Sequence, residues 1–161
     1  MRFLRRPLAF ALSMLILLGF LFSQASAAET EKRLTILFTH DTHDHFLPMP
    51  AERGGEYGGY TRLAALLKAE RAAAQTPVVT LDAGDFSMGS LFQTIYTTDA
   101  PELRALGAMG YDVTTLGNHE FDYRARGLAD MLRAAADSGD ICPAIVQANY
   151  KPPESDAGTW Q

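Results

Sequence analysis

Short apolar runs rich in β-branched residues alternate with amphipathic segments along most of this chain. The runs that indicate buried strands lie at residues 33–40, 78–81, 111–116 and 144–148. Between them, Leu63, Leu66 and Leu67 recur at helical spacing within residues 60–74, and a second amphipathic pattern covers residues 128–135. This order predicts an α/β fold in which helices cover a parallel sheet.

The connections between these runs carry turn and cap signals. Residues 41–59 contain two prolines and four glycines, which predicts a loop throughout. Before the third strand, Asp99 is expected to cap a helix with Pro101 in its first turn and Glu102 completing a capping box. Residues 103–109 would supply the inner face of that helix. No internal repeat interrupts the pattern.

The first 27 residues have the pattern of a signal peptide. Arginines at positions 2, 5 and 6 precede an apolar run at 8–22, and Ala25-Ser26-Ala27 is a small-residue cleavage site. Cleavage after Ala27 predicts export to the periplasm, the cell surface or the medium. An uncleaved anchor is the alternative, but the run is shorter than the roughly 20 residues of a spanning helix, so no stable membrane anchor is expected. Arg5-Arg6 also raises twin-arginine export.

Charge and cysteine content exclude some classes of partner. The formal net charge is −5 and becomes more negative once the arginines of the leader are removed. This balance argues against binding to nucleic acid polymers or anionic membranes. A small phosphorylated substrate remains possible because metal ions can invert the local field. Cys142 is the only cysteine, so it is either a small residue packed beside a strand or a thiol that pairs outside this sequence.

Polar clusters follow the predicted strands. They lie at residues 40–45, 82–85 and 117–122, with Asn149 after the last strand. Taken singly, each cluster could be a turn, a helix cap or a group of solvated charges. The carboxyl ends of parallel strands share one edge of a sheet, however, and all four histidines fall in the first and third clusters. If residues 40–45 were extended, Asp41, His43 and His45 would face the same side.

Carboxylate, imidazole and amide ligands together suit divalent manganese, iron or zinc. Two such ions about 3.5–4 Å apart, bridged by one carboxylate, can clamp a phosphoryl oxygen and generate a hydroxide nucleophile. The convergence of the clusters therefore predicts a two-metal centre.

As a set, these motifs resemble the calcineurin-like metallophosphoesterases. The residues that carry the resemblance are Asp41-x-His43, Gly84-Asp85, Gly117-Asn118-His119-Glu120 and Asn149. The longer motifs at 58–63, 82–85 and 117–122 are similar to the exported 5′-nucleotidase and 2′,3′-cyclic phosphodiesterase branch. The resemblance covers about residues 34–149 and implies the N-terminal portion of a β-sandwich flanked by helices.

The resemblance also implies metal ligands. Asp41 and His43 would bind one ion, Asp85 would bridge both ions, and Asn118 would bind the second. The cofactors implied are two divalent ions, whether Mn, Zn or Fe.

Further roles are implied around the metals. His119, oriented by Asp122, would stabilise the phosphate in the transition state or assist the leaving oxygen. Glu120 and Asn149 would hold the loops in place. His45 receives no role from the resemblance.

The implied activity is metal-dependent hydrolysis of phosphate esters, above all nucleoside 5′-phosphates in nucleotide catabolism. No histidine follows His119, whereas the family adds later histidines in a Gly-His-x-His motif and a C-terminal domain that binds the base. The expected division is therefore a leader at 1–27, the N-terminal part of a metallophosphoesterase domain at 28–150 and an open tail at 151–161. A catalytically silent metal-binding fragment and a thiosulfohydrolase are the alternatives, although Phe121-Asp122 favours the nucleotidase branch.

Overall fold

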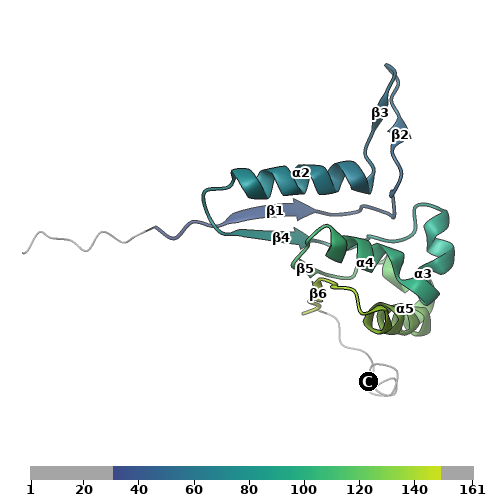
Figure 1. Cartoon of the computed structure of the whole chain (residues 1–161). Helices are drawn as coiled ribbons and strands as arrows, with labels where there is room; N and C mark the ends of the chain where they lie inside the picture. Colours follow the sequence, from purple (N-terminus) through teal and green to yellow (C-terminus); the bar gives the residue numbers. More distant parts are fainter. Residues whose placement is uncertain (1–30, 150–161) are drawn as a thin grey trace, which may run out of the picture. The chain divides into compact units, whose positions relative to one another are not determined.

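The computed structural model describes residues 31–149, so the expected leader at 1–27 and the tail at 151–161 lie outside the described residues. From residue 33 onward, the described elements belong to one compact unit. Its main sheet has four strands, which are β1 (Thr35–Thr39), β4 (Val78–Asp82), β5 (Val113–Thr114) and β6 (Ala144–Ile145). All neighbouring strands are parallel and their order is β1-β4-β5-β6, as Figure 1 shows. The predicted α/β class with a parallel sheet is confirmed.

β1, β5 and β6 are shorter than the apolar runs that predicted them, whereas β4 extends one residue beyond its run. The third run was expected to pair over residues 111–116, but β5 covers only Val113–Thr114. Beyond Thr114 the backbone turns away to form the loop that precedes Gly117.

Three helices lie close to the predicted positions, namely α2 (Tyr60–Ala73), α4 (Pro101–Ala108) and α5 (Arg124–Ser138). Two short helices before α4 were not predicted, η1 (Leu91–Ile95) and α3 (Tyr96–Asp99), and a third, η2 (His119–Phe121), precedes α5. Among residues 31–149 no helix has the length and apolar character needed to cross a bilayer.

The segment at 41–59 is not only a loop. It contains a small antiparallel hairpin made of β2 (Met49–Pro50) and β3 (Glu56–Tyr57). Arg62 at the start of α2 donates from Nη2 to the Glu56 carboxylate at 2.9 Å. This ion pair ties the hairpin to the helix, which is a packing role for Arg62.

The predicted cap of α4 is wrong. Asp99 is the last residue of α3, and Ala100, with a φ of 46°, joins α3 to α4 in the left-handed region. Pro101 does occupy the first turn of α4. Glu102 forms no capping box, because its side chain turns inward and is fully buried.

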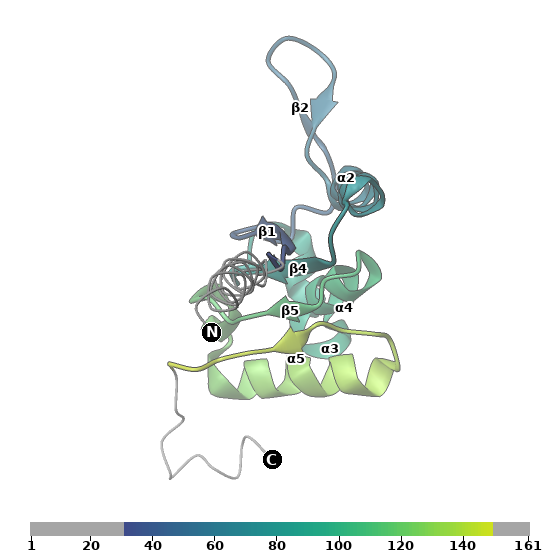
Figure 2. The same ribbon diagram turned by 90° about the vertical axis from the view of Figure 1, so that its left-hand side faces the viewer.

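Helices cover one face of the sheet, beside which they gather in Figure 2. On that face Leu37 packs against the core and its register partner Thr80 is fully buried. On the opposite face Ile36 and Phe38 are 56% and 59% exposed. Leu66, expected on the inner face of α2, is also exposed. A second sheet that would complete a sandwich is not among the described residues.

The core between sheet and helices is built largely from α3, α4 and α5. Its fully buried apolar side chains include Leu106, Leu128 and Met131. The buried Tyr96 of α3 donates its hydroxyl to the Glu120 carbonyl oxygen at 2.8 Å. Through this hydrogen bond, the core holds the segment that follows β5 in place. Cys142 is half-buried before β6, and burial raises the pKa of its thiol.

Candidate metal centre

The loops that follow β1, β4 and β5 are hydrogen-bonded to one another. Asp41 N donates to the Gly84 carbonyl and His43 N to the Asp85 carbonyl, both at 3.0 Å. His119 N donates to Oδ1 of Asp85 at 2.9 Å. The convergence of the three polar clusters at one sheet edge is therefore present in the structure.

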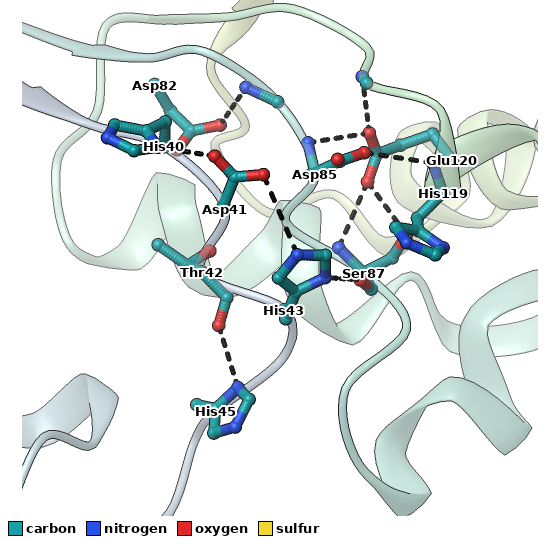
Figure 3. A network of polar contacts seen from close by, with 12 residues as sticks. His40, Asp41, Thr42, His43, His45, Asp82, Asp85, Ser87, His119 and Glu120 are labelled. Atoms are coloured by element: carbon teal, nitrogen blue, oxygen red, sulfur yellow. Dashed lines mark hydrogen bonds and ion pairs between the residues drawn. The ribbon is translucent and has the colours of Figure 1, made fainter.

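The first loop is not extended. Asp41, His43 and Asp44 have φ values of 50°, 43° and 42°, so the expectation that alternating side chains face one side is wrong. His45 instead lies with Nδ1 3.2 Å from the Thr42 carbonyl oxygen, and Figure 3 shows it away from His119. Left-handed backbone turns Asp41 and His43 toward the second loop.

Two glycines permit these loops to touch. A Cβ on Gly117 would lie 2.1 Å from Oδ1 of Asp85, and a Cβ on Gly89 would lie 1.9 Å from the His43 carbonyl oxygen. Only a residue without a side chain fits at either place. The close approach of the loops therefore requires glycine at positions 89 and 117.

His43, Asp85 and His119 form a group that suits a metal ion. Each offers a ligand atom within 4.8 Å of the other two, and all three residues are half-buried (Figure 3). Asp41 is adjacent, with Oδ1 3.7 Å from Nε2 of His43. A hydrogen bond from His40 and the nearby histidine charges lower the pKa of Asp41, which favours the anionic form that a cation requires.

The tautomer of His43 is set by its second nitrogen. Nδ1 lies 3.0 Å from the Ser87 carbonyl oxygen, so Nδ1 carries the hydrogen and donates. Nε2, on the side of Asp41, therefore keeps its lone pair free. Such a backbone partner is the usual orienting contact of a metal-binding histidine. Ser87 was not predicted because a lone serine gives no signal in the sequence.

Asn118 lies beside the same carboxylate. One terminal atom of its amide is 3.2 Å from Oδ2 of Asp85. As the nitrogen it donates to Asp85; as the oxygen it forms with Asp85 a pair of acceptors suited to sharing one cation. In the orientation that satisfies both ends of the amide, the nitrogen donates to Asp85 and the oxygen accepts from His119 N at 3.2 Å, so the implied role of Asn118 as a metal ligand stays a prediction.

His119 pairs with Asp122 across one turn. Nδ1 of His119 is 2.8 Å from Oδ2 of Asp122, and both side chains are more than one-third exposed. This hydrogen bond is the main cause that raises the pKa of His119, and the charges of Asp122, Asp85 and Glu120 add to it. Nε2 is left to face solvent or a substrate.

The fully buried Glu120 connects the second and third loops. Its carboxylate accepts hydrogen bonds from Asp85 N at 3.0 Å, Ser87 N at 3.0 Å, Ser87 Oγ at 2.8 Å and Gly117 N at 2.6 Å. One side chain therefore fixes the backbone on both sides of the metal group.

Asn149 is exposed at the end of the described chain, and its predicted role stays a prediction. Gln147, which was not predicted, does reach the third loop. Its Oε1 accepts from Thr115 Oγ1 at 2.5 Å and from Leu116 N at 3.2 Å. Gln147 thereby ties β6 to the residues just before Gly117.

Comparisons with known proteins agree with this arrangement. Residues 34–146 match the calcineurin-like phosphoesterase family. A 5′-nucleotidase from Bos taurus is 38% identical over 107 residues, which are 62% of this chain and 18% of that protein. The structure of NAD nucleotidase from Haemophilus influenzae superposes with a TM-score of 0.64 at 27% identity, over 77% of this chain and 22% of that one.

A 5′-nucleotidase precursor from Thermus thermophilus gives a TM-score of 0.62 at 30% identity, over 78% of this chain and 24% of that structure. The chain thus spans less than a quarter of the length of each of these relatives.

Proposed function

Because this chain belongs to the calcineurin-like phosphoesterase family, we propose that it supplies the N-terminal part of a phosphohydrolase that acts on nucleoside 5′-phosphates. The observation that carries the proposal is that His43, Asp85 and His119, from the loops after β1, β4 and β5, place side-chain atoms within 4.8 Å of one another, which joins proposed metal ligands and a proposed substrate donor in one site. The nucleotidase names of the relatives support the substrate class.

Four side chains would hold two divalent ions. Asp41 and His43 would hold one ion, Asn118 would hold the second, and Asp85 would serve both. The donor set of carboxylates, imidazole and amide suits Mn, Zn or Fe. When bound, the ions neutralise charge on the phosphoryl oxygens and lower the pKa of water.

His119 would act on the substrate rather than on an ion. Its Nδ1 donates to Asp122, which fixes the ring, and the raised pKa favours the charged imidazole, in which Nε2 also carries a hydrogen. An imidazole that carries both hydrogens can donate to a phosphoryl or leaving oxygen, whereas a metal ligand must present a lone pair. Asp122 would serve as the residue that orients and charges His119.

Four ligands shared by two ions leave each ion incompletely held. Activity is therefore proposed for the full-length protein, in which further ligands close the centre and a further domain holds the nucleotide. The leader at 1–27 would direct export, with cleavage after Ala27.

The proposal is tested with full-length protein, Mn²⁺ and adenosine 5′-monophosphate, measuring released phosphate. Asp85→Asn removes the shared carboxylate, and His119→Ala removes the donor. Each change should lower kcat by about 10²–10⁴-fold, the range typical of a lost catalytic group. Asp130→Asn on the outer part of α5 alters the charge equally and should leave kcat unchanged.

Thiosulfate-based substrates and an aryl phosphate serve as parallel assays. Release of sulfate without release of phosphate would indicate that the protein is a thiosulfohydrolase and would contradict the proposed phosphohydrolase activity. No turnover of any substrate, together with no heat of Mn²⁺ binding, would leave a silent relative and contradict the proposal.

A further inference from the structure

Three strands of the main sheet meet at the carboxylate of Asp82, a buried residue that the proposed function does not use. Asp82 is the last residue of β4 and is 4% exposed (Figure 3). Thr39, which ends β1, is its register partner, and Thr114 ends β5 on the other side of β4. A carboxyl group at this depth is strongly disfavoured unless hydrogen-bond donors surround it.

The hydrogen bonds of this carboxylate come from donors on separate segments. Oδ1 accepts from Thr39 Oγ1 at 2.9 Å. Oδ2 accepts from Thr114 Oγ1 at 2.8 Å and from Gly84 N at 3.0 Å. The Thr39 hydroxyl also lies 2.9 Å from the hydroxyl of Tyr111. Because β1 holds one oxygen and β5 holds the other, the carboxylate is fixed in the orientation in which Oδ2 faces the amide of Gly84.

Gly84 transmits this constraint to two proposed metal ligands. Its carbonyl oxygen accepts from Asp41 N at 3.0 Å, and Asp85 follows it in the chain. The φ of Gly84 is 89°, and a Cβ at this position would lie 2.6 Å from Gly117 N, so the residue is confined against the third loop. Gly84 is therefore bonded to Asp82 through its nitrogen and to Asp41 through its oxygen.

We propose that Asp82 is a positioning residue that sets the separation between the carboxylates of Asp41 and Asp85. Its side chain anchors Gly84 to the ends of β1 and β5, and Gly84 holds the backbone of Asp41 and begins the turn that presents Asp85. The inference rests on the metal centre of the proposed function, but it concerns a residue that is not itself a ligand. The role requires hydrogen-bond acceptors rather than charge.

A purely structural role would make Asp82 equivalent to the other buried polar side chain on its face of β4, that of Thr80. Thr80 lies two residues earlier and is fully buried. Its Oγ1 accepts from Nε and Nη2 of Arg71 at 3.1 and 3.0 Å. These bonds join β4 to the last turn of α2 and include none of the three loops. Thr80→Ala is therefore the matched control for Asp82→Ala, since both changes remove buried hydrogen bonds from one strand.

Hydrogen exchange of the metal-free, full-length protein is the first measurement, read by mass spectrometry on peptides that cover residues 83–86. Asp82→Ala removes both acceptors, so the amide of Gly84 should exchange about 10-fold faster or more. Asp82→Asn can accept from Gly84 N through Oδ1 and donate to Thr39 Oγ1 through Nδ2. Its exchange should stay within about threefold of that of the natural protein. Thr80→Ala should leave the rate at residues 83–86 unchanged.

Mn²⁺ affinity is the second measurement, made by titration calorimetry on the same variants. Asp82→Ala should bind Mn²⁺ about 10–100-fold more weakly, the usual loss when a group behind a metal ligand is removed. Asp82→Asn should remain within about threefold of the natural protein, because it keeps the acceptor that faces Gly84. Thr80→Ala should match the natural affinity, although it and Asp82→Ala should both unfold at a lower temperature.

Natural exchange or natural Mn²⁺ affinity in Asp82→Ala would overturn the inference, as would equal losses in Asp82→Ala and Thr80→Ala. Equal losses in Asp82→Ala and Asp82→Asn would also overturn it, because charge rather than an acceptor would then be required.

If Asp82→Ala does not fold, Thr114→Val takes its place. This change keeps the shape of the side chain and removes one of the two donors to Oδ2, so exchange at residues 83–86 should be about threefold faster or more. An unchanged rate would overturn the inference. Neither measurement needs turnover. If the natural protein releases no phosphate while these results hold, the proposed function alone is contradicted.

Discussion

The contact between His119 and Asp122 shows how a single residue sets the chemistry of its neighbour. The carboxylate fixes Nδ1 at 2.8 Å and raises the pKa of the imidazole, so that the ring carries charge at a higher pH than a free histidine does. Because both groups are partly exposed, solvent weakens this contact as a source of stability. The main effect of this contact is to set the protonation state of His119 and the direction in which Nε2 points.

Asp122→Asn should lower the pKa of His119 toward the ordinary value of 6.5, because the largest cause of the shift is removed. The raised pKa means that the natural contact stabilises the fold below about pH 6.5 and is lost as pH rises through the pKa of His119. The variant should thus be less stable than the natural protein at pH 6 and similar to it at pH 9. NMR titration of metal-free protein and urea unfolding at both pH values measure this.

Asp130→Asn is the matched control for that prediction. Asp130 lies near Arg126 and Arg133 on α5, and arginine does not titrate in this range. Its effect on unfolding should be the same at pH 6 and pH 9. A pKa of His119 that does not move in Asp122→Asn would show that Asp122 is not the cause.

At the scale of elements, the site depends on loops that approach more closely than side chains allow. Gly117, at the end of the β5 loop, lies against Asp85 at the end of the β4 loop. Gly107 makes a similarly tight approach elsewhere, where a Cβ would lie 1.7 Å from the Ile141 carbonyl oxygen. Gly107 lies away from the proposed metal centre, so a comparison of the two positions distinguishes the effect of tight packing from an effect on metal binding.

Gly117→Ala and Gly107→Ala should each destabilise the protein by about 1–3 kcal/mol, the usual cost of overpacking. Only Gly117→Ala should weaken Mn²⁺ binding, by about 10–100-fold, because it displaces Asp85. Thermal unfolding and titration calorimetry on the same preparations measure both effects. Equal metal affinity in the two variants would contradict the close fit at Gly117.

The positions of the strands could be predicted from the sequence, but their exact ends and the helix cap at Asp99 could not. Apolar β-branched runs predicted the four parallel strands, since their pattern is local. The extent of pairing was not predictable, because loop bonds such as that from Asp41 N to Gly84 decide where strands end. Capping at Asp99 failed because α3 already occupies that residue. The convergence of Asp41, His43, Asp85 and His119 followed from the rule for parallel strands.

Supporting residues were harder to predict than reactive ones. Ser87 contacts His43 through its carbonyl oxygen, which every residue possesses, and the sequence around Gln147 contains no distinctive motif. The sequence predicted that the Glu102 side chain would cap the start of α4, whereas in the structure this side chain is buried in the core. Such contacts join distant segments and are set by the three-dimensional fold.

At the scale of the molecule, one face of the sheet carries exposed apolar side chains among residues 31–149. Ile36 and Phe38 on β1 and Val146 after β6 are each more than half exposed. Contiguous apolar surface of this kind promotes association or dye binding in water.

Residues 28–161, purified alone, should bind an apolar dye and self-associate as concentration rises. The double change Ile36→Glu and Phe38→Glu should reduce dye fluorescence by roughly half or more and shift sedimentation toward the monomer. Leu91→Glu with Ile141→Glu places equal charge at exposed positions outside the sheet and should do neither. A natural chain that is monomeric and silent toward the dye would contradict the expectation.

The strand order β1-β4-β5-β6 repeats the order of the chain. Each strand of the main sheet is laid down beside the one synthesised before it, so no strand must be inserted between two that have already paired. The residues from Asp41 to Asp122 are all present once the segment that follows β5 has been made, and Gln147, just after β6, is then added as a final tie. The polar edge of the sheet can consequently assemble in step with synthesis, from the N-terminus onward.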